Sequence, residues 1–251
     1  MDKNFIREYG KLETTNWWFQ IRQKIILQTI RRFIPKGKST GLKILNVGAA
    51  TGASSRWLSA LGEVVSVEYD PLFLEYLTAQ GIPATSASIT ALPFAANSFD
   101  LVCAFDVVEH VEDDKKAMLE LARVCKPGGN VCITVPAFQS LWSNHDVINE
   151  HYRRYTKKTY QNIIERDILL TLYSSYFNSI LFPPIFLVRK ITGLFKNKLS
   201  NKQSDFVYIP TNAFVNNTLK IIFGIEPYLL KLMRFPFGVS IIFLFEKKSD
   251  L

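Results

Sequence analysis

Cysteine and histidine are scarce in this sequence, with three of each among 251 residues. Cys103, Cys125 and Cys132 are odd in number, lie in apolar stretches and lack Cys-x-x-Cys spacing. The sequence therefore predicts reduced, buried thiols in a cytoplasmic protein and argues against a disulfide framework. The first ten residues carry charges but no apolar h-region, so no secretory signal peptide is expected in them.

Internal repeats, low-complexity tracts and nucleic-acid motifs are also missing. The net charge is +8, but Lys and Arg are spread through every segment and are not interleaved with aromatics in one arm. We therefore expect no nucleic-acid partner. An anionic membrane surface or an acidic small molecule would complement the same charge, so charge alone does not choose between them.

An apolar run followed by a glycine-bounded turn stands at residues 42–52. Leu42, Ile44 and Val47 belong to a short strand-like stretch that ends at Gly48, and a helical pattern follows Gly52. Such a strand, turn and helix bring bare backbone and a helix N-terminus against a ligand, because glycine can take positive φ and has no Cβ. The sequence therefore predicts a cofactor at this turn, within one α/β domain whose length suffices for a large core.

The glycine spacing distinguishes between cofactors. A dinucleotide fingerprint requires G-x-G-x-x-G, whereas Gly48 and Gly52 are separated by Ala49, Ala50 and Thr51. The run ILNVGAATG resembles the first motif of the class I S-adenosylmethionine-dependent methyltransferases. It departs from that motif at Asn46, where an acid is usual, and at Ala50, where glycine is usual. The resemblance implies S-adenosylmethionine as the cofactor, in a loop shaped by Gly48, Ala50 and Gly52.

Further cofactor residues are expected where later strands end. Glu68 lies 20 residues after Gly48 at the end of a predicted strand, where a carboxylate accepts hydrogen bonds from ribose hydroxyls. The run from Ser88 through LPF to FDLV again resembles the methyltransferases. This resemblance implies that Ser88 and Ile89 contact the adenine and that Phe105 borders the sulfonium. Carboxyl ends of parallel strands share one rim, so these residues should lie together.

The order of predicted elements from residue 42 to residue 137 is βαβαβαβαβ, with a KPGG turn ahead of the fifth strand. The resemblance implies a Rossmann-like seven-stranded sheet of order 3-2-1-4-5-7-6 with helices on both faces. One methyltransferase domain is expected over residues 1–251. Its parts are an N-terminal helical cap (1–38), the core (39–175), a helical lid insertion (176–234) and the last strand (235–251).

An amphipathic helix is predicted over residues 14–34, with Thr15 or Asn16 as its N-cap. In methyltransferases of this class a leading helix often covers the cofactor, which implies that Trp17, Trp18 and Arg22 line the site. An aromatic stripe packed on the sheet explains the same pattern and is the commoner role.

The three histidines all follow strand ends, and two lie in the polar run from Trp142 to Tyr155. Histidine suits proton transfer near neutral pH, so His110, His145 and His151 are candidate bases on the acceptor side. His145 backed by Asp146, or His110 beside Glu109, would supply that base. The same run resembles a bacterial methyltransferase subgroup linked to small-molecule biosynthesis, so Trp18, Trp142 and Arg154 are assigned to the acceptor. Alternatively, these residues only hold a loop over the sheet.

A metal site is left open by the spacing Asp106-x-x-Glu109-His110. Some O-methyltransferases hold a divalent ion with a similar motif and one further ligand, here His145 or His151. The ion would lower the pKa of an acceptor hydroxyl. Glu-His after this strand is also widespread in metal-free relatives, so the metal is unknown.

The C-terminal part is apolar and basic. Residues 168–188 carry no charge, but Pro183 and Pro184 argue against a membrane span and for a strand followed by a helix. A basic linker and a second apolar helix over 212–233 precede the last strand; the linker residues are Arg189, Lys190, Lys196, Lys198 and Lys202. A lid, a homodimer face and a peripheral membrane contact would each explain these helices.

The sequence thus favours a methyltransferase that transfers a methyl group from S-adenosylmethionine to a small-molecule acceptor of apolar or anionic character. A hydroxyl oxygen is favoured because the candidate bases are histidines. N- or C-methylation on the same fold, a non-catalytic S-adenosylmethionine-binding protein and a nicotinamide oxidoreductase are the alternatives.

Overall fold

The computed structural model of the protein describes residues 3–34, 41–194 and 212–249. Its centre is a seven-stranded sheet of order β3-β2-β1-β4-β5-β7-β6, which confirms the expected order. The strands β5, β7 and β6 pair antiparallel to one another and the remaining pairs are parallel. The strands are β1 (Leu42–Val47), β2 (Gly62–Glu68), β3 (Ala84–Ser86), β4 (Phe99–Phe105), β5 (Cys125–Pro136), β6 (Leu169–Phe177) and β7 (Ser240–Lys247).

The central strands are apolar because helices cover both faces of the sheet. In β4 every residue except Asp100 is buried. The expected turn at Pro127 to Gly129 lies inside β5, because β5 already pairs with β4 at Cys125 and Phe99. A register shift between Phe99 and Leu101 accommodates it, and Gly128 takes a φ of +71° there. The KPGG segment is therefore an irregularity within the ladder.

The N-terminal part contains two helices where the sequence predicts one. They are α1 (Lys3–Thr15) and α2 (Trp17–Phe33), and they meet at Asn16, whose side chain caps α2 by accepting from Trp18 N at 2.9 Å. The expected cap is confirmed. The first helix was not predicted because its sequence is largely polar and carries Gly10 in its interior.

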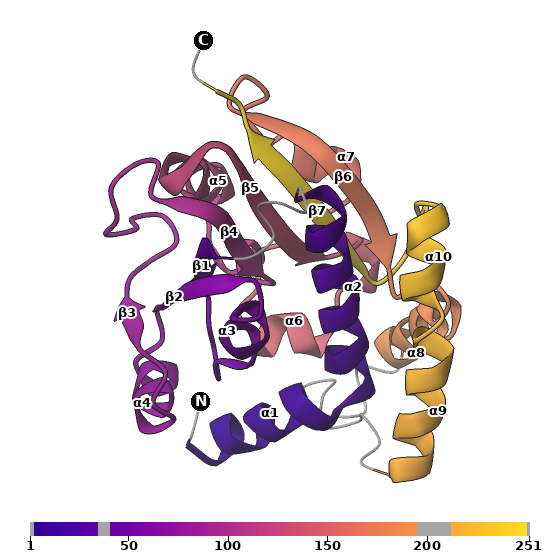
Figure 1. The fold of residues 1–251 in the computed structure, drawn as a ribbon. Coiled ribbons are helices and arrows are strands. Elements are labelled where there is room, and N and C mark those ends of the chain that lie inside the picture. The colour runs from indigo at the N-terminus through magenta and orange to yellow at the C-terminus, as the bar shows by residue number, and fades with distance from the viewer. Residues whose placement is uncertain (1–2, 35–40, 195–211, 250–251) are drawn as a thin grey trace.

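The other helices follow the strands along the chain. They are α3 (Ala53–Leu58), α4 (Pro71–Ala79), α5 (Asp114–Val124), α6 (Asn144–Ile148), α7 (Lys157–Gln161), α8 (Phe182–Leu194), α9 (Ala213–Phe223) and α10 (Glu226–Leu232). The predicted helix over 212–233 is thus α9 and α10, which stand end to end beside α2 in Figure 1. Asp70 caps α4 by accepting from Leu72 N at 2.8 Å, as its position before Pro71 suggests.

Two apolar cores lie on the two faces of the sheet. One contains α5 and α7 residues such as Met118 and Tyr160, and the other contains α2 residues such as Ile25 and Ile30. The second core is closed by α9 and α10, since the Trp17 ring packs edge-on against Phe223 at 5.6 Å. The inserted helices are therefore integrated with the N-terminal helix.

The segment between β6 and β7 contains α8, α9 and α10. Of the predicted basic linker, Arg189 and Lys190 belong to α8, whereas Lys196, Lys198 and Lys202 lie outside the described residues. Within the described ranges, none of the helices is both long and apolar enough to cross a membrane. All three cysteines are buried free thiols.

Candidate active site

A cavity of about 1780 Å³ lies at the carboxyl ends of β1, β2, β4 and β5, walled by α1, α2, α6 and α8. It exceeds the range of roughly 300–1,000 Å³ that is usual for one small ligand, so it has room for a cofactor and an acceptor together. All predicted site residues except Gly52 line it. They are Gly48, Ala50, Glu68, Ser88, Ile89, Phe105, His110, His145, His151, Trp18, Trp142 and Arg154.

The turn after β1 is formed by residues in left-handed backbone conformations. Gly48 has a φ of +72°, and Ala50 has a φ of +48°, which costs a non-glycine residue about 1–2 kcal/mol. A Cβ on Gly48 would overlap with Val107 Cγ2. Gly52 caps α3 with a φ of +84° and faces Ile82 and Leu77, so it shapes the turn from behind and does not line the cavity.

Asn46 departs from the family acid and has a defined role in this chain. Its side-chain amide donates to the hydroxyls of Ser54 and Ser55, both at 2.8 Å. Asn46 Oδ1 is buried without a hydrogen-bond partner among the described residues. The amide thus ties β1 to the first turn of α3 by donating, where a carboxylate would accept.

Glu68 binds the cofactor turn directly. Its Oε2 accepts from Ala50 N at 2.7 Å, and its Oε1 accepts from Tyr69 N at 2.7 Å and Asp70 N at 3.0 Å. An ionised carboxylate has about four acceptor sites, so one remains for a further donor. The predicted ribose ligand is therefore also the residue that holds the turn in place.

The residues predicted to contact the adenine and the sulfonium are also on the cavity wall. The hydroxyls of Ser88 and Thr90 lie 2.9 Å apart beside buried Ile89. Phe105 ends β4, with its ring 5.4 Å from that of Trp57 on α3. These side chains form an apolar wall with one polar edge, which suits a purine ring.

Arg22 reaches from α2 across the cavity. Its guanidinium binds the Asp106 carboxylate at 2.5 Å and the Thr134 hydroxyl at 2.9 Å. It also stacks over the rings of Trp18 at 5.0 Å and Phe105 at 5.8 Å. The predicted lining by Arg22, Trp17 and Trp18 is observed, and Trp17 packs in the core as well. The helix therefore both lines the cavity and packs on the sheet.

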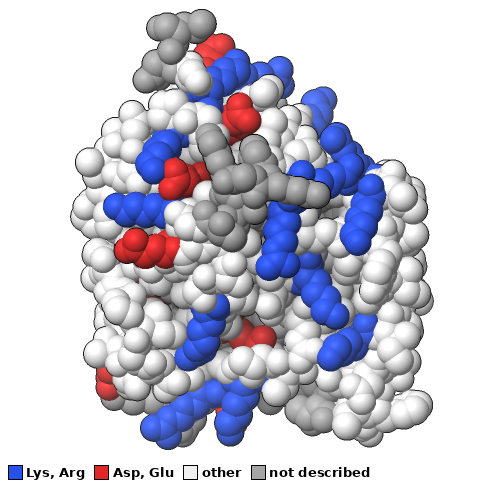
Figure 2. Space-filling view, viewed as in Figure 1, with Lys and Arg blue, Asp and Glu red and all other residues white. Residues whose placement is uncertain are grey.

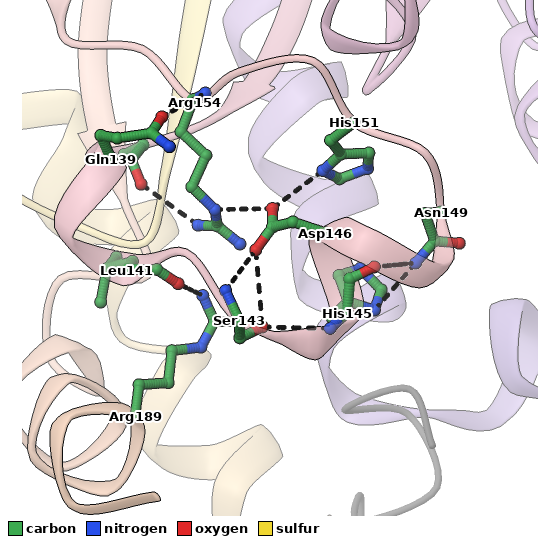
Figure 3. A network of polar contacts seen from close by, with 10 residues as sticks. Gln139, Leu141, Ser143, His145, Asp146, Asn149, His151, Arg154 and Arg189 are labelled. Atoms are coloured by element: carbon green, nitrogen blue, oxygen red, sulfur yellow. Dashed lines mark hydrogen bonds and ion pairs between the residues drawn. The ribbon is translucent and has the colours of Figure 1, made fainter. Parts of the chain in front are cut away.

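A polar network on α6 and the following loop positions one histidine (Figure 3). His151 Nδ1 lies 2.9 Å from Asp146 Oδ1, which also accepts from Arg154 Nε at 2.7 Å. The other oxygen of Asp146 accepts from Ser143 N at 2.8 Å. Burial alone would raise the pKa of Asp146, but the His151 and Arg154 contacts hold it well below its usual value. Asp146 is therefore an anion that orients the His151 ring.

The prediction that Asp146 backs His145 was wrong. His145 contacts Asn149, with Asn149 Nδ2 3.1 Å from its Nδ1, and Asp146 serves His151. The reason is the capping box at the start of α6, in which the Asp146 carboxylate turns back to Ser143. Adjacent residues on a helix point in different directions, so His145 lies outside this pair.

Glu109 and His110 line the cavity beside His151, on the predicted acceptor side. Glu109 is fully buried, neither carboxylate oxygen has a hydrogen-bond partner among the described residues, and burial raises its pKa well above the usual value. Burial, and then the nearby His151, lower the pKa of His110 to about 4. One ligand atom from each of Glu109, His110 and His151 lies within 4.8 Å of the others. Asp106 is bound by Arg22 instead, so the predicted Asp106-Glu109-His110 set is not assembled.

Glu13 of α1 lines the cavity and has no assigned place in the sequence-based prediction, because α1 itself was not predicted. It accepts a hydrogen bond from the Thr51 hydroxyl, which ties α1 to the cofactor turn. Burial raises the pKa of Glu13 from 4.5 to about 7, although the bond from Thr51 lowers it. No pattern in the sequence identifies Glu13 as a site residue.

This raised pKa predicts a pH dependence of stability. The folded state binds the proton more tightly than the unfolded state, so the contribution of Glu13 is full below its unfolded pKa and is lost as pH rises through about 7. We expect the free energy of unfolding to fall by on the order of 1 kcal/mol more in wild type than in Glu13→Gln over this window. Urea unfolding of both proteins at a pH below this range and at a pH above 7 measures the difference. Equal changes in the free energy of unfolding in the two proteins would contradict the raised pKa of Glu13.

The sheet order and the cavity at its carboxyl ends are those of a class I S-adenosylmethionine-dependent methyltransferase. Residues 45–133 match the family model of a methyltransferase domain, so this part of the chain carries a methyltransferase domain. The matched range begins within β1, includes β2, β3 and β4, and ends within β5, and the cofactor turn lies between β1 and β2.

Relatives and solved structures agree with this assignment. The chain is 36% identical over 100 residues to a demethylmenaquinone methyltransferase of Renibacterium salmoninarum, covering 39% of this chain and 42% of that protein. It is 26% identical over 133 residues to a probable S-adenosylmethionine-dependent methyltransferase of Mycobacterium tuberculosis, covering 52% and 46%. The matches therefore span less than half the length of these relatives.

Phosphoethanolamine N-methyltransferase 2 of Haemonchus contortus, solved with S-adenosyl-L-methionine, has a similar fold, with a TM-score of 0.64 and 17% identity over 99% of this chain and 58% of that chain. This likeness extends beyond the 45–133 match to almost the whole chain. At this identity it concerns the fold alone.

Proposed function

We propose that this protein transfers the methyl group of S-adenosylmethionine to a hydroxyl of a small-molecule acceptor, with His151 as the general base. The observation that carries the proposal is the His151–Asp146 pair at 2.9 Å, whose histidine lines the same cavity as the Gly48 turn and Glu68. A histidine that a carboxylate orients beside space for two ligands can accept a proton next to the cofactor site.

The cofactor half of the cavity fits S-adenosylmethionine. This cofactor supplies an electrophilic methyl group on a sulfonium centre. Glu68 offers a carboxylate for the ribose hydroxyls, and Ser88 and Ile89 offer a polar edge and an apolar face for the adenine. Phe105 at the end of β4 borders the acceptor half.

On the acceptor side, His151 has the geometry of a base. Its Nδ1–H donates to Asp146, which leaves Nε2 to accept the proton of the acceptor hydroxyl as the oxygen–methyl bond forms. Methyl transfer of this type needs a positioned nucleophile and removal of one proton. The neutral ring of His110, whose pKa is about 4, packs edge-on against His151 at 4.5 Å and limits where the acceptor can lie.

The same side chains also fit a divalent cation. Glu109 has two buried oxygens without partners among the described residues, and His110 and His151 are within reach of the same point. In such a site, the Asp146 carboxylate would orient His151 as a ligand, an arrangement common around metal-bound histidines. An ion held there would lower the pKa of the acceptor hydroxyl directly.

The acceptor half of the cavity is partly apolar, with Leu181 and Ile185 near α8, Leu219 of α9, and Trp18 and Trp142 on its walls. Arg154 and Arg189 add positive charge. The name of one relative specifies demethylmenaquinone as its acceptor, which supports an apolar acceptor here. An apolar ring that carries a hydroxyl fits these walls.

The cofactor assignment predicts the effect of Glu68→Ala. We expect it to weaken S-adenosylmethionine binding by about 10–100-fold, because a hydrogen bond to a charged group is worth about 1.5–3 kcal/mol and the Ala50 contact is lost as well. Calorimetric titration with S-adenosylmethionine, S-adenosylhomocysteine and NAD measures it. Glu63→Ala, an exposed carboxylate on the same strand, is the matched control and should bind like wild type. Binding of NAD alone would contradict the assignment.

The reaction is tested with methyl-labelled S-adenosylmethionine and a panel of phenols, aliphatic alcohols, primary amines and demethylmenaquinone. Label on an oxygen is the expected result. Label only on nitrogen or carbon would refute the hydroxyl acceptor while the methyltransferase assignment stands. Tight cofactor binding without transfer to any class would favour a non-catalytic cofactor-binding protein.

A further inference from the structure

Helices α9 and α10 carry an exposed apolar stripe. Gly224 and Ile225, between them, both keep right-handed helical backbone angles, so the two helices continue one another. The stripe consists of Phe214 (77% exposed), Ile221 (71%), Ile225 (49%), Tyr228 (69%) and Leu232 (86%). At about 100° per residue these five positions fall within about 60° of one another, along about 27 Å of helix. This is one continuous face.

The stripe belongs to neither the core nor the cavity. The opposite side of the same helices packs inward, where Phe223 and Leu230 are buried in the core shared with α2. Leu219 lines the cavity from that inner side. The outer face therefore buries nothing in the described structure, although a run of exposed apolar side chains of this length usually marks an interface.

The charge around the stripe is positive. Residues 212–239, which the structure describes, contain three basic residues, Lys220, Lys231 and Arg234, and one acidic residue. That acid, Glu226, is buried and accepts from Ser179 N at 2.6 Å and Ile180 N at 2.7 Å. Lys231 is exposed beside the stripe, over the Tyr228 ring at 5.6 Å, and the exposed Arg234 follows α10 with its guanidinium over the Tyr173 ring at 5.3 Å. Figure 2 shows Lys and Arg gathered on the side of α2 and α10, with few acidic groups there.

We propose that the α9–α10 stripe docks on the surface of a bilayer that contains anionic phospholipid. An interfacial helix buries an apolar face at the boundary of headgroups and acyl chains while its Lys and Arg side chains meet anionic headgroups. The stripe and its flanking lysines have this arrangement. A second copy of the chain is a poorer occupant, because a symmetric contact through the stripe would bring like-charged Lys231 and Arg234 side chains together. Docking does not depend on the proposed reaction.

The test is co-sedimentation of the full chain with vesicles of phosphatidylcholine alone and of phosphatidylcholine mixed with phosphatidylglycerol. Wild type is expected to bind the mixed vesicles and to bind phosphatidylcholine at least 10-fold more weakly. Leu232→Glu should reduce binding to the mixed vesicles at least 10-fold, and Lys231→Gln by about 5-fold. Leu119→Glu, an exposed leucine 41% accessible on α5, is the matched control and should bind like wild type.

Thermal unfolding verifies that the variants are folded, and size-exclusion chromatography gives their oligomeric state. Absence of wild-type binding to the mixed vesicles would overturn the proposal. So would equal loss of binding in Leu119→Glu. A wild-type dimer that Leu232→Glu converts to a monomer, without lipid binding, would assign the stripe to a second copy and likewise overturn it. These readouts need no methyl acceptor, so failure of the proposed reaction and failure of docking are separable.

Discussion

Replacing His151 by alanine is expected to lower kcat for methyl transfer by about 10²–10⁴-fold while leaving S-adenosylmethionine affinity within a few-fold of wild type. The reason is the position of the side chain. Its ring is oriented by Asp146 at 2.9 Å on the acceptor side of the cavity, away from the Gly48 turn and Glu68. Initial rates at saturating cofactor, with the acceptor found in the labelled panel, measure kcat, and calorimetry measures the affinity.

Three matched measurements decide what His151 does. Asp146→Asn keeps the shape but removes the charge that orients the ring, so it should lower kcat with a smaller effect than His151→Ala. His145→Ala removes a histidine on the same wall that contacts Asn149 instead, and should change kcat little. Added imidazole should restore part of the activity of His151→Ala, which a purely structural role would not permit. Unchanged kcat in His151→Ala would refute the base.

Chelation distinguishes a general-base role of His151 from a divalent-cation site. If Glu109, His110 and His151 hold an ion, EDTA should abolish wild-type turnover and added Mg²⁺ or Mn²⁺ should restore it. If His151 accepts the proton, turnover should survive EDTA and Glu109→Gln should retain activity. The second result is the one that the proposed general-base role of His151 predicts.

The sheet was predictable from local patterns that require no tertiary information. The apolar run before Gly48, the acid at the end of β2 and the FDLV run of β4 each place a strand end on one rim, and the structure brings them together. The order of the strands in the sheet came from the resemblance. An antiparallel return such as β7 between β5 and β6 leaves no signature in local spacing.

Contacts between distant segments were less predictable. The Arg22 bridge to Asp106 joins residues 84 positions apart, and the pairing of Asp146 with His151 depends on how α6 is capped. Sequence spacing identifies the chemical groups on the rim but cannot decide which of two nearby histidines a carboxylate faces. Glu13 was missed for another reason, since it lies on α1, whose sequence is largely polar and carries Gly10 in its interior.

Gly48→Ala is expected to destabilise the cofactor turn strongly. It should cost about 1–2 kcal/mol for the left-handed φ of +72° and a further 1–3 kcal/mol, roughly, for overlap of the new Cβ with Val107. For a chain of this length a loss of about 3 kcal/mol lowers Tm by roughly 6–12 °C. Cofactor affinity should fall as well, since the turn must move to relieve the overlap.

Gly81→Ala is the matched control, because Gly81 has nearly the same φ, +67°, and nothing lies within 4 Å of its Cβ position. It should cost only the backbone share, about 1–2 kcal/mol, and leave cofactor binding unchanged. Adding Val107→Ala to Gly48→Ala removes the overlapping methyl groups and should recover part of the loss, giving a favourable coupling energy in a double-mutant cycle. Equal costs for Gly48→Ala and Gly81→Ala would show that backbone conformation alone, and not the close approach of Val107, requires glycine at this turn.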